Sequence, residues 1–219
     1  MRPFAAIGRV VRRAWLFGFV ASAILTAFSI AYIDRPLASF IDAHFRHTIG
    51  WVALDQSIEP LKLVAISALF FLFWVGYRSV CGYGLKPWAV KAFVCSWAVV
   101  WGLATEFVFK QIFGRGWPDP TYTQYHLYGF RFLHAGQNWS SFPSGTAIGS
   151  TALATTLASL FPRLRAVCVL FAAVLCIAVV VANYHWLSDS IAGAFLGVSI
   201  GWMSVTVLDQ SFVNKREVT

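Results

Sequence analysis

Residues 140–161, SSFPSGTAIGSTALATTLASLF, join a short polar turn to a long apolar run. Pro143 interrupts the extended segment, and Ser144 and Gly145 stand where a helix can begin. The first turn of a helix carries unsatisfied N–H groups and a partial positive charge, and Gly145 lets an anion approach the backbone. The stretch therefore predicts either an ordinary capped helix start or an anion site at the mouth of an apolar helix.

The composition indicates a membrane protein. Of 219 residues, 58% are hydrophobic and 12% are charged, whereas a soluble domain carries about twice that share of charge. Six stretches are continuously apolar over nearly the length that crosses a bilayer, which favours helices over strands. We predict an all-α polytopic membrane protein, a single domain over 1–219 with a six-transmembrane-helix bundle, its spans at 15–33, 61–76, 88–109, 144–161, 166–184 and 188–208.

The charge distribution predicts an orientation. Most Lys and Arg residues fall on the side that is inside if the N-terminus is cytoplasmic. Because they collect between spans, the net charge of +8 does not indicate a nucleic-acid partner. We predict a bacterial inner-membrane protein with both termini cytoplasmic and a periplasmic active site, since all five histidines fall outside: His44, His47, His126, His134 and His185.

The cysteines predict neither a disulfide framework nor a metal site. They lie in or beside apolar segments and form no metal-binding spacing. We expect no cofactor and no metal, and the sequence leaves the oligomeric state open. The four are Cys81, Cys95, Cys168 and Cys176.

The two long outer segments between spans differ in composition. Residues 34–60 are amphipathic, which predicts either an interfacial helix lying on the bilayer or a lid over a lipid site. Residues 110–143 are rich in Gly, Pro, aromatic and charged residues, and a loop of that length is usually functional.

Three polar stretches meet span ends on the outer face. EFVFKQIFGRGWPDP carries Lys110 and Arg115, SSFPSGTA opens the fourth span, and NYHWLSD holds His185 and Asp189. The last pair is four residues apart, so one helical face can present both, and a carboxylate there can orient the imidazole. Cations, a helix N-terminus and an oriented histidine are what phosphoryl transfer requires.

In order and spacing, these stretches resemble the three signatures of the type 2 phosphatidic acid phosphatase superfamily, the lipid phosphate phosphatases. The resemblance implies a metal-independent phosphatase on a six-helix membrane core. It implies that His185 attacks phosphorus and forms a phosphohistidine, that Asp189 orients it, and that Lys110, Ser144 and Gly145 bind phosphate oxygens.

Three positions depart from the family pattern. Trp117 stands where the first signature has Arg, and Arg115 is the candidate to supply that guanidinium. Thr146 stands where the second has its proton-donating His. Val179 stands where the third has Arg.

The missing acid leaves three interpretations open. His134 can replace it, with Arg131 beside it to bind phosphate. A lipid diphosphate, whose leaving group is already stabilised, can dispense with an acid. Alternatively, the protein is a weak or inactive lipid-phosphate-binding or regulatory relative.

A membrane lipid phosphatase is the favoured interpretation, acting on a lipid phosphate or diphosphate such as a polyprenyl diphosphate, a phospholipid or a lipid A phosphate. A transporter is the remaining alternative, because Glu106 lies inside an apolar span; a Glu106–Lys110 pair is the simpler account. We assign catalysis to His185, Asp189 and His134, and phosphate binding to Lys110, Arg115, Ser144, Gly145, Thr146 and Arg131.

Overall fold

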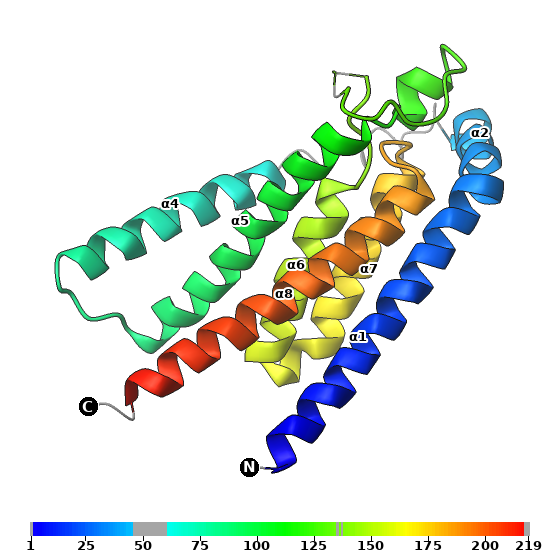
Figure 1. Ribbon diagram of the computed structural model, residues 1–219. Helices are drawn as coiled ribbons and strands as arrows, with labels where there is room; N and C mark the ends of the chain where they lie inside the picture. Colours follow the sequence, from blue (N-terminus) through cyan, green and yellow to red (C-terminus); the bar gives the residue numbers. More distant parts are fainter. Residues whose placement is uncertain (1, 46–60, 135, 137, 217–219) are drawn as a thin grey trace.

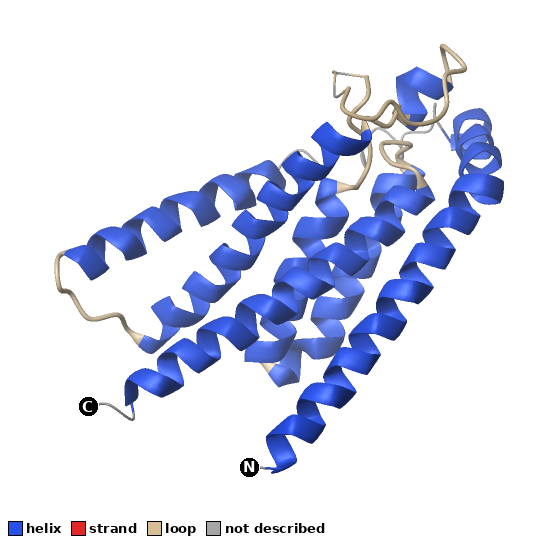
Figure 2. Ribbon diagram, viewed as in Figure 1, coloured by secondary structure: helices blue, strands red, loops and turns tan. Residues whose placement is uncertain are grey.

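The computed structural model describes residues 2–45, 61–134, 136 and 138–216, and every regular element in these ranges is helical (Figures 1 and 2). The all-α prediction is confirmed for this part of the chain. In chain order the elements are α1 (Arg2–Phe28), the π-helical η1 (Ser29–Ile33), α2 (Asp34–Phe45), α4 (Leu61–Val80), α5 (Pro87–Phe113), η2 (Pro118–Tyr122), α6 (Gly145–Leu160), the 3₁₀ turn η3 (Pro162–Leu164), α7 (Arg165–Val181) and α8 (Leu187–Arg216).

Each of the six predicted spans overlaps one long helix, α1 or one of α4 to α8. Helix α6 has 16 residues, and the apolar part of α4 covers Ile66–Val80, so length and composition alone do not confirm the count of six. Four helical segments of the described chain are long and apolar enough to cross a membrane: Arg12–Phe45, Pro87–Phe113, Pro162–Val181 and Leu187–Val207.

The bundle exposes apolar side chains on its outside. Phe73 on α4 is 79% exposed and Leu170 on α7 is 66% exposed. Water would penalise such a surface, whereas lipid tails match it. The outer faces of these helices are therefore built for a bilayer.

Helices α6 and α8 form the centre of the bundle and pack more extensively than any other pair. An added Cβ on Gly197 would lie 2.0 Å from Thr151 Oγ1, and one on Gly201 would lie 2.5 Å from the Ala152 carbonyl oxygen. Small residues of α8, Gly197 and Gly201, thus permit a close contact with α6.

The helices are arranged so that the polar loops gather at one end (Figure 1). Both chain ends lie at the other end, while α2 and the loop between α5 and α6 lie together opposite them. Helix α4 packs mainly against α5 at the edge of the bundle.

The first helix does not stop where the sequence predicts. The expected span ends at residue 33, but the chain stays helical through η1 into α2. Asp34 is buried at this junction, and Ile41 packs against Val179 and Val180 of α7. The first part of the predicted amphipathic segment thus packs against the bundle; its remainder, 46–60, lies outside the described residues.

Candidate active site

His185 lies in the short connection between α7 and α8. Its backbone N–H and that of Tyr184 both donate to the Val179 carbonyl oxygen, at 3.0 and 3.1 Å. Asn183 adopts a left-handed backbone with φ of 56°, and its side-chain amide donates to the Ala38 carbonyl oxygen at 3.2 Å. These contacts hold the loop against α2 and α7, and the histidine is buried.

Asp189 holds one side of the imidazole ring, although the shared helical face predicted for the two residues is wrong. Helix α8 begins at Leu187, so His185 precedes it. Asp189 lies in the first turn and accepts the backbone N–H of Trp186 at 3.2 Å, as in a capping box. Its Oδ2 lies 3.6 Å from His185 Nδ1, which leaves Nε2 on the other side of the ring.

Ser141 links these two groups. Its hydroxyl donates to Asp189 Oδ2 at 2.5 Å and lies 3.5 Å from His185 Nδ1. The carboxylate oxygen that faces the imidazole is thereby fixed in position, and it fixes the ring in turn.

Arg115 occupies a different place from the one predicted. Its guanidinium has no exposed surface and pairs with the carboxylates of Asp189 and Asp34, the latter at 2.6 Å. Burial alone would lower the pKa of this guanidinium, but the two carboxylates outweigh burial and raise the pKa above its usual value. Arg115 thus contacts Asp189 on the side of the carboxylate away from His185 and helps to hold it in place.

Asp34 is the residue of this network that sequence reasoning missed. Besides Arg115, it accepts hydrogen bonds from the hydroxyls of Ser29 and Ser188. Tyr128 donates to the Ile30 carbonyl oxygen at 2.7 Å and lies 3.2 Å from Arg115 Nη2. The available signal was an acid at the end of an apolar span, where ionisable groups are rare and functional.

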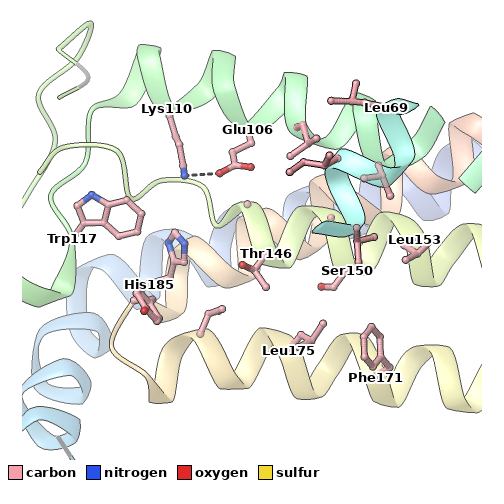
Figure 3. A pocket seen from close by; sticks show the side chains of 18 residues that line it. Leu69, Glu106, Lys110, Trp117, Thr146, Ser150, Leu153, Phe171, Leu175 and His185 are labelled. Carbon is pink, nitrogen blue, oxygen red and sulfur yellow. Dashed lines mark hydrogen bonds and ion pairs between the residues drawn. The ribbon is translucent and has the colours of Figure 1, made fainter. Parts of the chain in front are cut away.

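A cavity of about 590 Å³ lies beside His185, between α4, α5, α6 and α7. Its polar end brings together Lys110, Thr146 and His185, three of the residues predicted for the site, with Glu106 beside them. Figure 3 shows Lys110 and Glu106 reaching from α5 toward the side where Thr146 and His185 lie. The Lys110–Glu106 pair is confirmed, with Nζ 2.5 Å from Oε1.

The start of α6 forms the floor of this polar end. Ser144 is the N-cap, and its hydroxyl accepts the Ala147 N–H at 3.3 Å, so the predicted capped start is confirmed. Gly145 lines the cavity beside Glu106: an added Cβ would lie 2.1–2.2 Å from the Glu106 carboxyl atoms. A carboxylate thus lies directly against the first residue of the helix, where the free N–H groups attract negative charge.

Two further predicted residues are not brought into the cavity. The Arg131 guanidinium lies 4.1 Å from the centre of the Trp139 ring, and His134 is exposed on the same loop. Neither side chain lines the cavity. The structure therefore gives no geometric support to His134 as the replacement acid or to Arg131 as a phosphate ligand.

Comparison with known proteins places these features in a family. Residues 91–212 match the PAP2 superfamily, and this range contains Lys110, Ser144 and His185. The chain belongs to the PAP2 superfamily. The match covers more than half of the chain and all three polar stretches, so the resemblance inferred from the motifs is confirmed.

Two phosphatases illustrate the relationship. A lipid A 1-phosphatase of Rhizobium etli is 31% identical over 154 residues, which are 65% of this chain and 62% of the relative, so less than two thirds of that protein is matched. The crystal structure of a transmembrane PAP2-type phosphatidylglycerolphosphate phosphatase from Bacillus subtilis superposes with a TM-score of 0.51, at 14% identity, over 90% of this chain and 96% of that one. The second comparison shows a shared fold.

The three departures from the PAP2 pattern all line the cavity. They are Trp117, Thr146 and Val179. The Trp117 ring centre lies 4.9 Å from that of His185, and Lys110 Nζ lies 5.3 Å from the Trp117 ring. Aromatic and aliphatic groups thus stand where the pattern has arginines, and Lys110 is the cation that remains at this end of the described cavity.

Proposed function

We propose that this chain is a lipid phosphatase that removes phosphate from a membrane lipid. The observation that carries the proposal is the cavity, because it joins a polar end containing Lys110, Gly145 and His185 to an apolar interior. Leu69 of α4, Leu153 of α6 and others form the interior walls. A phosphate at one end and a hydrocarbon chain along the other match this division.

The substrate class is an amphiphile with a terminal phosphate or diphosphate. Candidates are a lipid A phosphate, in keeping with the name of the Rhizobium relative, a phospholipid monoester and a polyprenyl diphosphate. Helix α4 packs mainly against α5, yet its side chains line the same cavity as those of α7. A lipid can therefore enter from the bilayer between α4 and α7.

His185 is the proposed nucleophile. Nε2 attacks phosphorus while the bond from phosphorus to the lipid oxygen breaks, which leaves a phosphohistidine that water then hydrolyses. Asp189 holds Nδ1 and stabilises the imidazolium that forms. Lys110 and the first N–H groups of α6 bind the phosphate oxygens, so the positive charge in this mechanism comes from the chain itself and no metal takes part.

The proposed topology has six spans, α1 and α4 to α8, with the active site at the periplasmic face of a bacterial inner membrane. The placement of both chain ends at one end of the bundle supports an even number of crossings. The concentration of Lys and Arg in the connections at that end supports a cytoplasmic location for the termini.

Phosphate release by the purified protein in detergent tests the proposal. We expect release from dodecyl phosphate or dodecyl diphosphate that is unchanged by EDTA. The reason is that Lys110 and the α6 N-terminus supply the electrostatic stabilisation. Release that stops on chelation and returns with a divalent cation would contradict the metal-independent mechanism. Binding of both compounds without release would favour a lipid-phosphate-binding protein instead.

Filling the apolar part of the cavity is expected to exclude long chains selectively. Gly149 lines the cavity, and apart from its own neighbours along α6 no described residue comes within 4 Å of the position of an added Cβ. Gly149→Leu should displace two or three methylenes of substrate at about 0.8 kcal/mol each, which lowers kcat/KM for dodecyl phosphate about 15- to 60-fold. The measurement is kcat/KM for dodecyl and butyl phosphate, and the value for butyl phosphate should stay unchanged.

Gly76→Leu is the matched control for this experiment. Gly76 is an exposed residue of α4 that does not line the cavity and also has room for a Cβ. It should leave both substrates unaffected. Equal losses on the two chain lengths in Gly149→Leu would place the hydrocarbon chain elsewhere.

A further inference from the structure

The proposed reaction needs a proton donor that the predicted residues do not supply. The leaving lipid oxygen must be protonated unless it is already a stable anion. The hydroxyl of Thr146 is too weak an acid for this role near neutral pH, and His134 lies outside the cavity. Among the described residues that line the cavity, the titratable side chains are those of Glu106, Lys110, Tyr184 and His185.

Glu106 is the carboxyl group among these four, and it lies where the phosphate is expected. Its carboxyl atoms would be 2.1–2.2 Å from a Cβ on Gly145, so it rests against the first turn of α6. It also accepts a hydrogen bond from Lys110 Nζ at 2.5 Å. The side chain is 21% exposed, which leaves it open to the cavity and hence to a ligand.

We propose that Glu106 is the residue that protonates the leaving group, an inference that rests on the phosphatase function proposed above. A phosphate that binds Lys110 and the α6 N-terminus competes with Glu106 for the Lys110 ammonium group. It also brings a second negative charge next to the Glu106 carboxylate. Two anions in one site are held by sharing a proton. That proton is then placed next to the oxygen that departs.

The proton returns in the second half of the reaction. His185 Nε2 bonds to phosphorus as the lipid P–O bond breaks; the bond electrons pass to the lipid oxygen, which takes the proton from Glu106. The Glu106 carboxylate then accepts a proton from water as the water oxygen attacks phosphorus. The P–N bond electrons return to Nε2, inorganic phosphate leaves, and Glu106 is protonated again for the next cycle.

The dependence on the leaving group distinguishes an acid from a residue that only positions Lys110. Glu106→Gln keeps the shape of the side chain and an oxygen for Lys110 but removes the proton donor. We expect kcat/KM for dodecyl phosphate to fall about 100- to 10,000-fold, and kcat/KM for dodecyl diphosphate to fall less than about 10-fold. Both substrates are assayed on one preparation, so partial misfolding lowers both values alike and leaves their ratio unchanged.

Glu106→Asp is the conservative control, because it retains a carboxyl group. The quantity compared is kcat/KM for dodecyl phosphate divided by kcat/KM for dodecyl diphosphate. In Glu106→Asp this ratio should be closer to that of the unmodified chain than it is in Glu106→Gln. Equal losses on both substrates in Glu106→Gln, or no loss on either, would overturn the inference and leave Glu106 as a partner of Lys110. An unmodified chain that hydrolyses only the diphosphate would also overturn it, whereas release from neither compound would contradict the proposed phosphatase itself.

Discussion

His185→Gln is expected to abolish phosphate release, lowering kcat by about 10⁴-fold or more. Glutamine has a similar length, and its amide can still approach Asp189, but it has no nucleophilic ring nitrogen to form a covalent bond with phosphorus. Substrate binding should persist, because Lys110 and the α6 N-terminus are unchanged. The measurement pairs phosphate release with equilibrium binding of dodecyl phosphate.

His44→Gln is the control for the loss of a histidine. His44 is exposed on α2, and its Nδ1 lies 2.9 Å from the Phe40 carbonyl oxygen one turn earlier. This variant should release phosphate at the unmodified rate. Substantial turnover by His185→Gln would contradict the assignment of the nucleophile.

Arg115→Met is expected to destabilise the folded protein strongly. The side chain is fully buried between Asp34 and Asp189, so its removal leaves two carboxylates without their cation. Breaking a buried ion pair in this way costs about 3–5 kcal/mol in the free energy of unfolding. Thermal unfolding in detergent should show the midpoint lowered by on the order of 10 °C.

Arg35→Met is the matched control. Arg35 is exposed, and its guanidinium lies 5.3 Å from the centre of the Tyr128 ring. Losing this exposed contact should change the free energy of unfolding by no more than about 1 kcal/mol. An Arg115→Met protein with an unchanged midpoint and a raised KM would instead support the phosphate-binding role predicted from the sequence.

The sequence was sufficient to predict the parts of this molecule that depend on local spacing. The apolar runs gave the positions of the long helices. Ser144 followed by Gly145 gave the start of α6. Glu106 and Lys110, four residues apart in one helix, form the pair that this spacing predicts.

Contacts between distant segments could not be predicted in this way. Asp34 lies 81 residues before Arg115, and neither residue has a local pattern that selects the other. The predicted phosphate-binding role of Arg115 was inferred from its position two residues before Trp117, whereas its partners in the fold lie at the starts of α2 and α8. Tertiary packing therefore pairs Arg115 with two carboxylates and leaves Lys110 as the cation that faces the described cavity.

The contacts of Glu106 were likewise only partly predictable from the sequence. Its spacing to Lys110 predicted an ion pair, but its position against Gly145 depends on how closely α5 approaches α6. Gly102 of α5, where an added Cβ would lie 3.2 Å from a side-chain carbon of Ile148, permits that approach. A single sequence shows Gly102 but does not show which residue of another helix packs against it.

Trapping the covalent intermediate tests the central claim most directly. The purified chain is mixed with dodecyl phosphate that carries a radiolabelled phosphoryl group, quenched in base during turnover, and digested into peptides. The account predicts a base-stable, acid-labile label on the peptide that contains His185, and its absence in His185→Gln. Rapid turnover without a labelled peptide, or a label on another residue, would contradict it.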